Sequence, residues 1–266
     1  MTEQTLTAKT VAIHPTAIVD PTAQLDSGVT VEPYAIIEGD VTIGSGTVIG
    51  SHTRIAGGTR LGHGVIIHHG AAVGTAPQDL KYAGERTELF IGDRTIVREF
   101  ADLNRGTAVT GRTMIGSDCM IMAYAHVAHD NRVGNHVILA NAVQLGGHVT
   151  LGDWVFIGGA TVVHQFSLIG AHAMIGGGFR VTQDVLPYVI VGGYPLKTIG
   201  LNRIGLERRG FSTDQIRTLS KIIRIVVRSK LNKSQAVERL RAEMANVPEA
   251  LEVAAFIEQS ARGIVR

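Results

Sequence analysis

The strongest constraint on the fold is an aliphatic residue at every sixth position over most of the chain. One series of these residues runs from Ile13 to Val73, and a second runs from Ile91 to Val181. The step from Val73 to Ile91 is also a multiple of six, so both series share one phase. A helix would need apolar residues at i, i+3, i+4 and i+7, which this pattern does not give. The repeat therefore predicts short strands separated by turns.

A second, smaller residue stands two positions before nearly every aliphatic residue, as Ala17, Ala23, Val143 and Thr161 do. Residues two apart lie on the same side of an extended chain, so each hexad offers one large and one small inward side chain. Glycine and polar turn formers fill the other positions. A single short strand cannot bury such a face, whereas stacked coils bury it continuously. The pattern predicts a solenoid.

The repeat resembles the hexapeptide-repeat family of left-handed parallel β-helices over residues 11–186. In that family three hexads form one triangular coil. The resemblance implies that residues 18 apart lie in neighbouring coils, about 4.8 Å from each other. We use this spacing below to ask which side chains gather at one edge.

Interruptions and composition changes predict the domain boundaries. We expect a lead-in over residues 1–10, the β-helix over residues 11–186, a linker over residues 187–200 and a helical domain over residues 201–266. The repeat breaks over residues 74–90 but keeps its phase on both sides. Such a break indicates a loop that leaves one coil, and loops of this kind often form the binding face.

The expected helical domain carries three helix starts and a basic charge. Ser212 with Gln215 and Asn232 with Gln235 have the spacing of capping boxes, and Pro248 suits the first turn of a helix. From position 200 onward there are 13 Lys and Arg residues against 7 Asp and Glu residues. The polar side of the first helix is basic, with Arg217, Lys221, Arg224 and Arg228. This side is either a solvated face or a docking surface for an acidic partner.

Other features of the composition bear on location and partners. Cys119 is the single cysteine and stands in a small inward position, so we expect a buried thiol and no disulfide within the chain. The first ten residues are polar and do not resemble a secretory signal. The sequence contains no uninterrupted run of eighteen apolar residues, so we expect no membrane span. We expect a cytoplasmic protein with no nucleic-acid partner.

Four of the eleven histidines stand out as candidates for chemistry: His126, His129, His148 and His164. With 18 residues per coil, His129 and Gln165 fall in one column, and His148 falls one coil along and one residue over. His52, His136 and His172 instead recur at the third position after an aliphatic residue, so we expect them at exposed turns.

His129 is followed by Asp130, and a histidine beside a carboxylate suits a general base at neutral pH. Neighbours in a strand point to opposite faces, so a direct bond between these two side chains requires a turn. Gly147 falls one coil from His129 in the same column. Its backbone N–H is a candidate donor to an oxyanion.

Several longer strings make a narrower family resemblance. They are the strings at residues 78–84 (QDLKYAG), 125–130 (AHVAHD), 146–149 (GGHV), 163–166 (VHQF) and 208–211 (RRGF). Over essentially the whole chain these strings resemble the UDP-N-acetylglucosamine O-acyltransferase family of lipid A biosynthesis. The resemblance implies transfer of an (R)-3-hydroxyacyl group from acyl carrier protein to the 3-hydroxyl of UDP-N-acetylglucosamine, by a homotrimer whose sites lie between subunits.

The resemblance also implies roles for individual residues. His129 acts as the general base, Asp130 supports it and the Gly147 N–H holds the oxyanion. Contacts to the sugar and the acyl chain are implied for Gln78, Asp79, Lys81, His126, His148, His164 and Gln165. Contacts to the nucleotide or its phosphates are implied for Asn202, Arg208 and Arg209. Acyl transfer from a thioester needs a base and an oxyanion donor, so we expect no metal and no cofactor.

Three further positions bear on specificity. Gly177 falls where the family measures acyl length, and a glycine there favours a longer chain. Asn104 stands where relatives often have histidine, and Ile204 stands where an acidic residue often follows the family's asparagine. These two departures affect the expected acyl or sugar contacts and the expected nucleotide contacts.

Three alternatives remain open at this point. One is an acyltransferase that acts on a related amino-sugar nucleotide. Another is a β-helical zinc hydratase, with His126, His129 and His148 as ligands. The last is a non-catalytic scaffold, because a solenoid with a helical cap needs no active site.

Overall fold

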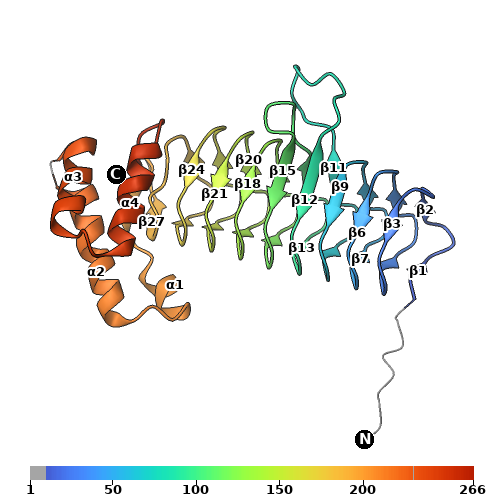
Figure 1. The fold of residues 1–266 in the computed structure, drawn as a ribbon, viewed down its shortest axis with the longest axis horizontal. Helices are drawn as coiled ribbons and strands as arrows, with labels where there is room; N and C mark the ends of the chain where they lie inside the picture. Colours follow the sequence, from blue (N-terminus) through green and yellow to red (C-terminus); the bar gives the residue numbers. More distant parts are fainter. Residues whose placement is uncertain (1–9, 230) are drawn as a thin grey trace, which may run out of the picture. The chain divides into compact units, whose positions relative to one another are not determined.

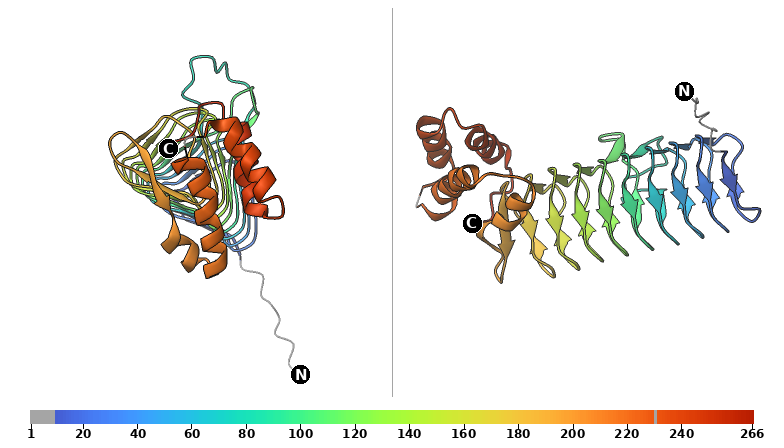
Figure 2. Two further views of the ribbon diagram at one scale, coloured as in Figure 1. Left: turned by 90° about the vertical axis from the view of Figure 1, so that its left-hand side faces the viewer. Right: turned by 90° about the horizontal axis from the view of Figure 1, so that it is seen from below.

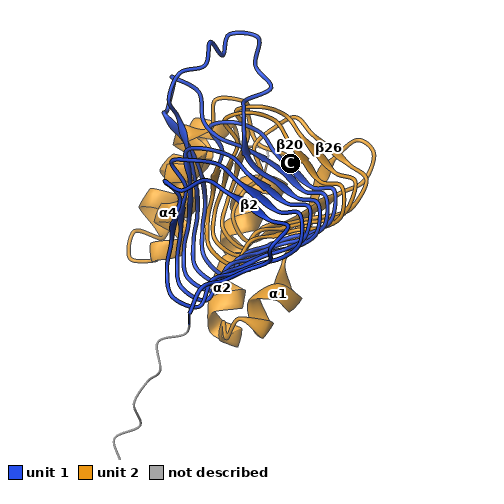
Figure 3. Ribbon diagram, turned by 90° about the vertical axis from the view of Figure 1, so that its right-hand side faces the viewer, with its two compact units in different colours: residues 1–131 blue, residues 132–266 orange. Residues whose placement is uncertain are grey.

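The computed structural model describes residues 10–229 and 231–266 (Figure 1). Most of the expected lead-in, residues 1–9, lies outside the described residues. The chain forms two compact units, one ending at Asn131 and the other beginning at Arg132 (Figure 3). The point of division lies within the region of the hexad repeat.

Unit 1 consists of short parallel strands on three faces, and each face takes every third strand. Strand β1 pairs with β4, β2 with β5 and β3 with β6, so successive strands along the chain change face. The first face contains β1 (Ala12–Ile13), β4 (Thr30–Val31), β7 (Val48–Ile49), β10 (Ile66–Ile67), β13 (Ile96–Val97) and β16 (Met120–Ile121). The second contains β2 (Ile18–Val19), β5 (Ile36–Ile37), β8 (Arg54–Ile55), β11 (Ala72–Thr75), β14 (Asp102–Asn104) and β17 (His126–Val127). The third contains β3 (Gln24–Leu25), β6 (Thr42–Ile43), β9 (Thr59–Leu61), β12 (Glu88–Ile91) and β15 (Arg112–Ile115).

Unit 2 begins with the same arrangement of strands. One face contains β18 (Arg132–Val133), β21 (Thr150–Leu151) and β24 (Leu168–Ile169). Another contains β19 (Ile138–Leu139), β22 (Phe156–Ile157) and β25 (Met174–Ile175). The third contains β20 (Gln144–Leu145), β23 (Val162–Val163) and β26 (Arg180–Val181). Strand β27 (Val189–Gly192) pairs with β25 and extends its face, and β28 (Lys197–Leu201) pairs with β27 in antiparallel orientation. Residues 187–200, expected as a linker, thus contain β27 and most of β28.

The C-terminal part of unit 2 is helical, as Figure 2 shows in orange and red. It contains α1 (Arg203–Arg208), α2 (Thr213–Ile223), the π-helical turn η1 (Arg224–Arg228), α3 (Lys233–Glu243) and α4 (Pro248–Gln259). Both predicted capping boxes are present, at Ser212 with Gln215 and at Asn232 with Gln235, and Pro248 occupies the first turn of α4. The short helix α1 was not predicted.

The core of the coils consists of the aliphatic residues of the repeat. Ile37, Ile55, Leu103, Leu145 and Ile157 are each at most 1 % exposed. Several smaller inward positions carry threonine, whose hydroxyl would be costly to bury without a partner. Thr47 Oγ1 donates to the carbonyl of Gly62, and Thr161 Oγ1 to that of Gly176, so these buried hydroxyls are satisfied.

The coils turn at residues whose backbone adopts the left-handed conformation. Positive φ recurs at the third position after an aliphatic residue, with values between 55° and 63° at His52, Asp130, His148, Trp154 and His172. Non-glycine residues rarely adopt this region, and here the fold requires it at one corner after another. The predicted turn position of His52, His136 and His172 is therefore confirmed.

Two loops leave the coils of unit 1. The first, residues 76–87, lies between β11 and β12, and Ile66 accordingly pairs with Ile96 rather than with a residue 18 positions later. The second, residues 105–111, lies between β14 and β15 and was not predicted, because Val109 continues the six-residue spacing. Val109 is 75 % exposed, so its assignment as an inward residue is wrong. The loop inserts a complete hexad, and spacing alone cannot detect such an insertion.

The two loops contact each other (Figure 1). The Arg105 side chain donates to the hydroxyl of Tyr82 at 2.9 and 3.2 Å, and the Ala108 N–H donates to Oε1 of Glu85 at 3.1 Å. These bonds attach Tyr82 and Glu85 of the first loop to the second loop, while Leu80 is fully exposed. Separately, no helix within the described residues is long and apolar enough to span a membrane.

Leu103 and Val109 stand in the same phase of the aliphatic repeat, but the structure predicts very different effects on stability when each is shortened. We expect Leu103→Ala to lower the free energy of unfolding by ~2–5 kcal/mol, because it leaves a cavity in the core. Val109→Ala serves as the matched control and should change the free energy by less than ~0.5 kcal/mol. Urea unfolding followed by circular dichroism measures both, and similar losses in the two variants would contradict this view of the core.

Candidate active site

In unit 1, His129 and Asp130 form a hydrogen-bonded pair at a corner of the coil. Nδ1 of His129 lies 2.7 Å from Oδ2 of Asp130. Neighbouring side chains in a strand would point apart, but Asp130 has a φ of 61° and begins the next side of the coil. The turn required by the sequence argument is therefore present.

The carboxylate of Asp130 is buried and held by two threonines of the second loop. The Thr107 N–H donates to Oδ1 at 3.1 Å, Thr107 Oγ1 donates to Oδ2 at 2.7 Å, and Thr110 Oγ1 donates to Oδ1. Burial by itself would raise the pKa of Asp130. The hydrogen bonds from Thr110, Thr107 and His129 outweigh burial and lower the pKa below its ordinary value. Asp130 is therefore an ionised acceptor at neutral pH.

This arrangement defines which nitrogen of His129 can act on a ligand. Because Asp130 binds Nδ1, His129 would act on a ligand through Nε2. The His129 side chain is 13 % exposed, whereas that of Asp130 is fully buried. A neutral imidazole held in this way can accept a proton at Nε2, and the adjacent carboxylate stabilises the positive charge that results.

Two further predicted residues of unit 1 meet at a second carboxylate. Nδ1 of His126 lies 3.1 Å from Oδ2 of Asp102, and Nε2 of Gln78 donates to the same oxygen at 3.1 Å. In the first loop, Oδ1 of Asp79 accepts the N–H of Lys81 at 3.0 Å, and the Lys81 side chain is exposed. The structure thus brings Gln78 and His126 together through a residue that was not predicted.

In unit 2, the N–H of Gly147 makes no hydrogen bond within the described residues, while its carbonyl accepts the N–H of Phe166 at 3.0 Å. Gly146 lies against the next coil, where a Cβ atom would come 2.8 Å from the backbone nitrogen of Gln165. The ring of His148 stacks on that of Phe166, with centroids 4.5 Å apart. This segment offers a donor and a flat ring beside each other.

His164 and Gln165 lie at the same corner of unit 2, one coil further along the chain. Nδ1 of His164 lies 2.9 Å from the carbonyl oxygen of Gln165, and the Gln165 side chain is exposed. Gly177 is also exposed, and a Cβ atom there would lie 3.0 Å from the carbonyl oxygen of Gly159. A side chain at position 177 would thus be tight against the neighbouring coil.

Two of the three predicted nucleotide residues of unit 2, Asn202 and Arg209, contact His172. Nδ2 of Asn202 donates to the His172 carbonyl at 2.9 Å, and its Oδ1 accepts the Gly205 N–H at the start of α1. Arg209 lies 3.2 Å from Nδ1 of His172, and its guanidinium lies over the Trp154 ring. Arg208 is exposed at the end of α1.

His172 is therefore not the exposed surface residue predicted from its spacing. Its ring stacks between Trp154 and Tyr188, and burial together with the charge of Arg209 lowers its pKa to about 4. The spacing located the turn correctly. It carried no information about Asn202 and Arg209, which flank α1 and contact His172.

Sequence reasoning missed the carboxylate Asp102 and the threonines Thr107 and Thr110. Asp102 pairs in register with His126, 24 positions later, because the second loop adds six residues to that coil. The 18-residue spacing therefore did not connect them. A search over all multiples of six would have found the pair.

Comparison with known proteins places these features in a family. Residues 184–265 match the family model described as Udp N-acetylglucosamine O-acyltransferase, domain 2, and residues 22–57 match the bacterial transferase hexapeptide model. The acyl-[acyl-carrier-protein]–UDP-N-acetylglucosamine O-acyltransferase of Myxococcus xanthus is 49% identical over 197 residues, covering 74% of this chain and 76% of its own. The chain belongs to this acyltransferase family. Its Herminiimonas arsenicoxydans member is 47% identical over 201 residues, covering 74% of this chain and 77% of its own.

A solved structure of the acyltransferase family agrees with the architecture. The UDP-N-acetylglucosamine O-acyltransferase of Moraxella catarrhalis has a TM-score of 0.93 at 40% identity and covers 96% of this chain and 99% of its own. The predicted resemblance is confirmed, and so is the predicted fold, a left-handed parallel β-helix followed by a small helical part. The chain is an acyltransferase, as the sequence predicted.

The contacts of Asp130 predict how its contribution to stability depends on pH. The folded state lowers the pKa of Asp130 below 3.8, so its ionised form stabilises the fold above that value and loses this effect as the pH falls through the folded pKa. We expect the difference in unfolding free energy between the wild type and Asp130→Asn to be larger at pH 7 than at pH 3. Urea unfolding at both pH values measures it. If the wild type and Asp130→Asn differ as much in unfolding free energy at pH 3 as at pH 7, the prediction is wrong.

Proposed function

We propose that this chain transfers an (R)-3-hydroxyacyl group from acyl carrier protein to the 3-hydroxyl of UDP-N-acetylglucosamine. The curated relatives carry the name of this donor protein and this acceptor. The observation that carries the mechanism is the pair of His129 and Asp130, with Nδ1 of the imidazole on a buried carboxylate. It provides a base for the hydroxyl without a metal or a covalent intermediate.

The reaction proceeds in two steps. Nε2 of His129 takes the proton of the sugar hydroxyl as the oxygen attacks the thioester carbonyl, and the carbonyl oxygen becomes an oxyanion. The Gly147 N–H, which has no partner within the described residues, donates to this oxyanion. The intermediate then collapses by breaking the carbon–sulfur bond. The thiolate leaves and takes the proton from His129, which restores the neutral imidazole.

The remaining predicted residues provide contacts to the substrates. Gln78, Asp79 and Lys81 of the first loop, with His126, His148, His164 and Gln165, line the sugar and acyl sites. Gly177 leaves the acyl groove open, and Asn202, Arg208 and Arg209 contact the nucleotide or its phosphates. Arg208 is the exposed member of this last set, so it is the one available to a phosphate without rearrangement.

We also propose the setting in which the enzyme works. It acts in the cytoplasm in the first step of lipid A biosynthesis, as a homotrimer whose sites lie between subunits. The family membership supports the pathway. The trimer and the location rest on the family resemblance.

The base assignment predicts a large and specific loss of activity. We expect His129→Ala to lower kcat by ~10² to 10⁴ without unfolding the protein, because a general base of this kind contributes about that much. The assay follows transfer from (R)-3-hydroxyacyl carrier proteins of different chain lengths to UDP-N-acetylglucosamine, after treatment of the protein with a chelator. His52→Ala, an exposed corner histidine, is the matched control and should keep full activity.

The same assay tests the substrates. Wild-type activity with an optimum at one chain length supports the proposed function and shows the length that the groove near Gly177 accepts. No product at any length from folded protein would contradict the 3-hydroxyl acceptor. The amino-sugar nucleotide would then be tested, followed by reconstitution with zinc.

A row of exposed cations on the helical part is the proposed contact for the carrier protein. Lys221 in α2 and Arg224 and Arg228 in η1 form no ion pair within the described residues. Arg224 borders three hollows, and Lys221 borders two of them. Such a surface suits an acidic partner such as acyl carrier protein.

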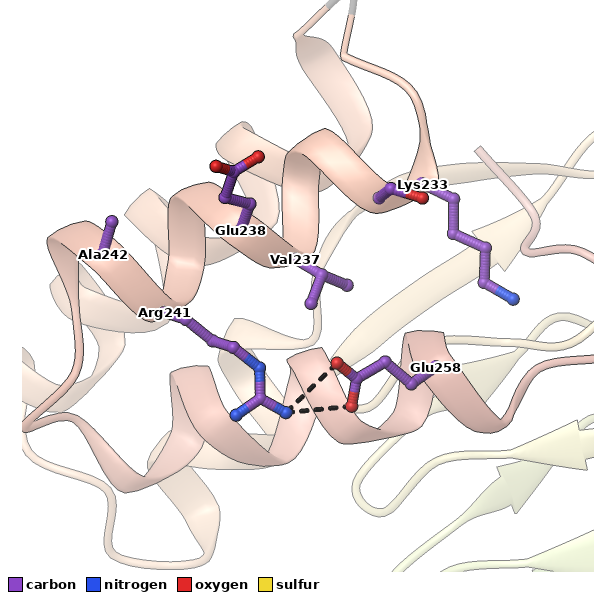
Figure 4. Close-up of a pocket in the computed structure, with 7 residues that line it drawn as sticks. Lys233, Val237, Glu238, Arg241, Ala242 and Glu258 are labelled. Carbon is purple, nitrogen blue, oxygen red and sulfur yellow. Dashed lines mark hydrogen bonds and ion pairs between the residues drawn. The ribbon is translucent and has the colours of Figure 1, made fainter.

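The hollow between α3 and α4 instead carries an ion pair across it. It encloses about 810 Å³, and the ion pair of Arg241 with Glu258 crosses it (Figure 4). Lys233 and Glu238 add one charge of each sign to its walls. We therefore assign the carrier protein to the cations of α2 and η1.

If the carrier protein docks on these cations, removing them should weaken its binding in a way that depends on the salt concentration. We expect the combined Lys221→Gln, Arg224→Gln and Arg228→Gln variant to raise KM for the acyl carrier protein by about 3- to 100-fold, with little change in kcat, because exposed charges contribute ~0.2–1 kcal/mol each. The effect should fade at ~0.5 M salt. Arg54→Gln, an exposed cation of unit 1, is the control. A KM that stays unchanged at low salt would exclude this surface.

A further inference from the structure

Unit 1 contains a second histidine–carboxylate pair, which the proposed base does not explain. Nδ1 of His126 lies 3.1 Å from Oδ2 of Asp102, and the two side chains are 19% and 32% exposed. The carboxylate takes Nδ1 of His126, so the nitrogen of this ring that remains for a ligand is Nε2. His126 stands only three positions before His129 in the sequence.

Asp102 is itself held by hydrogen bonds from two residues that precede it in the chain. Thr75 Oγ1 donates to Oδ1 at 3.0 Å, and Gln78 Nε2 donates to Oδ2 at 3.1 Å. Nδ2 of Asn104 donates to Thr75 Oγ1 at 2.8 Å, so this hydroxyl is directed at the carboxylate. Burial would raise the pKa of Asp102, but the bonds from His126, Thr75 and Gln78 outweigh burial and lower it. Asp102 is ionised at neutral pH.

An irregularity in the backbone places these donors. Strand β14 lies between β11 and β17, and Asp102 is in register with Ala72 on one side and with His126 on the other. The register shifts between Val73 and Thr75, so that Thr75 pairs with Asn104. Bulges of this kind often redirect a side chain beside a functional site. Here the shift lies where the chain leaves the coil for the loop that contains Gln78.

We propose that Asp102 is a positioning residue for the acyl transfer: it fixes His126 with Nε2 directed to the substrate, and through Gln78 it ties the first loop to that histidine. The proposal rests on the proposed function. It also gives Asn104, which departs from the histidine frequent in relatives, a defined task. The amide of Asn104 orients Thr75 and does not contact the substrate.

A purely structural role makes a different prediction from a positioning role. If Asp102 only fastens the loop to the coil, its loss should harm the enzyme whether or not His126 is present. If Asp102 acts through His126, its loss should have no further effect once that histidine has been replaced. A double-mutant cycle separates the two cases.

The experiment compares kcat/KM of the wild type, Asp102→Asn, His126→Gln and the double variant in the acyl-transfer assay. We expect Asp102→Asn to lower kcat/KM about tenfold, which corresponds to ~1.4 kcal/mol, and the double variant to match His126→Gln alone. Asp118→Asn is the matched control and should leave kcat/KM unchanged. Asp118 is similarly exposed, at 30%, and binds Arg94.

Two results would overturn the proposal. One is unchanged activity in Asp102→Asn, and the other is losses that multiply in the double variant. If Asp102→Asn does not fold, Thr75→Val takes its place, because it removes one of the hydrogen bonds to the carboxylate. Thr75→Val should lower kcat/KM in the wild type and have no further effect in the His126→Gln variant. A wild type without acyl transfer would contradict the proposed function instead, so the two failures are distinguishable.

Discussion

Burial of one aliphatic side chain per hexad is the interaction on which the rest of the structure depends. A strand of two residues has too few hydrogen bonds and too little apolar surface to persist alone, so it is stable only between two neighbouring coils. This requirement repeats from coil to coil and keeps the phase constant. Residues that face outward are left free to vary, and the candidate site uses those positions.

The loops of unit 1 show how the site departs from the repeat without disturbing it. Both loops leave and re-enter the coils in the same phase, so β13 pairs in register with β10 on one side and with β16 on the other. Thr107 and Thr110 of the second loop hold Asp130, and Gln78 of the first loop contacts Asp102. The coils provide fixed strand positions, and the loops provide the hydrogen bonds that orient the carboxylates.

Much of the fold and part of the candidate site could be predicted from the sequence. The repeat gave the strands, and local signals such as Ser212 with Gln215 gave the helix starts, because both depend on neighbours in the sequence. The pairing of His126 with Asp102 could not be found with an 18-residue spacing, since the second loop hides a hexad at Val109. The packing of His172 depends on α1 and Arg209, which follow it by thirty residues or more. Contacts of this kind arise from tertiary structure.

The corner geometry of the coils has a consequence for how such folds acquire chemistry. Asp130 has positive φ because it stands at a corner, and the same backbone conformation recurs at His148, Trp154 and His172. The strained turn that lets a histidine contact the next residue in the chain is thus already present throughout the solenoid, whether or not a reaction uses it. A new base and its carboxylate could therefore arise at another corner by two adjacent substitutions. In this fold the contact between a base and its carboxylate requires no remodelling of the coil backbone, and an inserted loop can then add the donors that hold the carboxylate, as Thr107 and Thr110 do here.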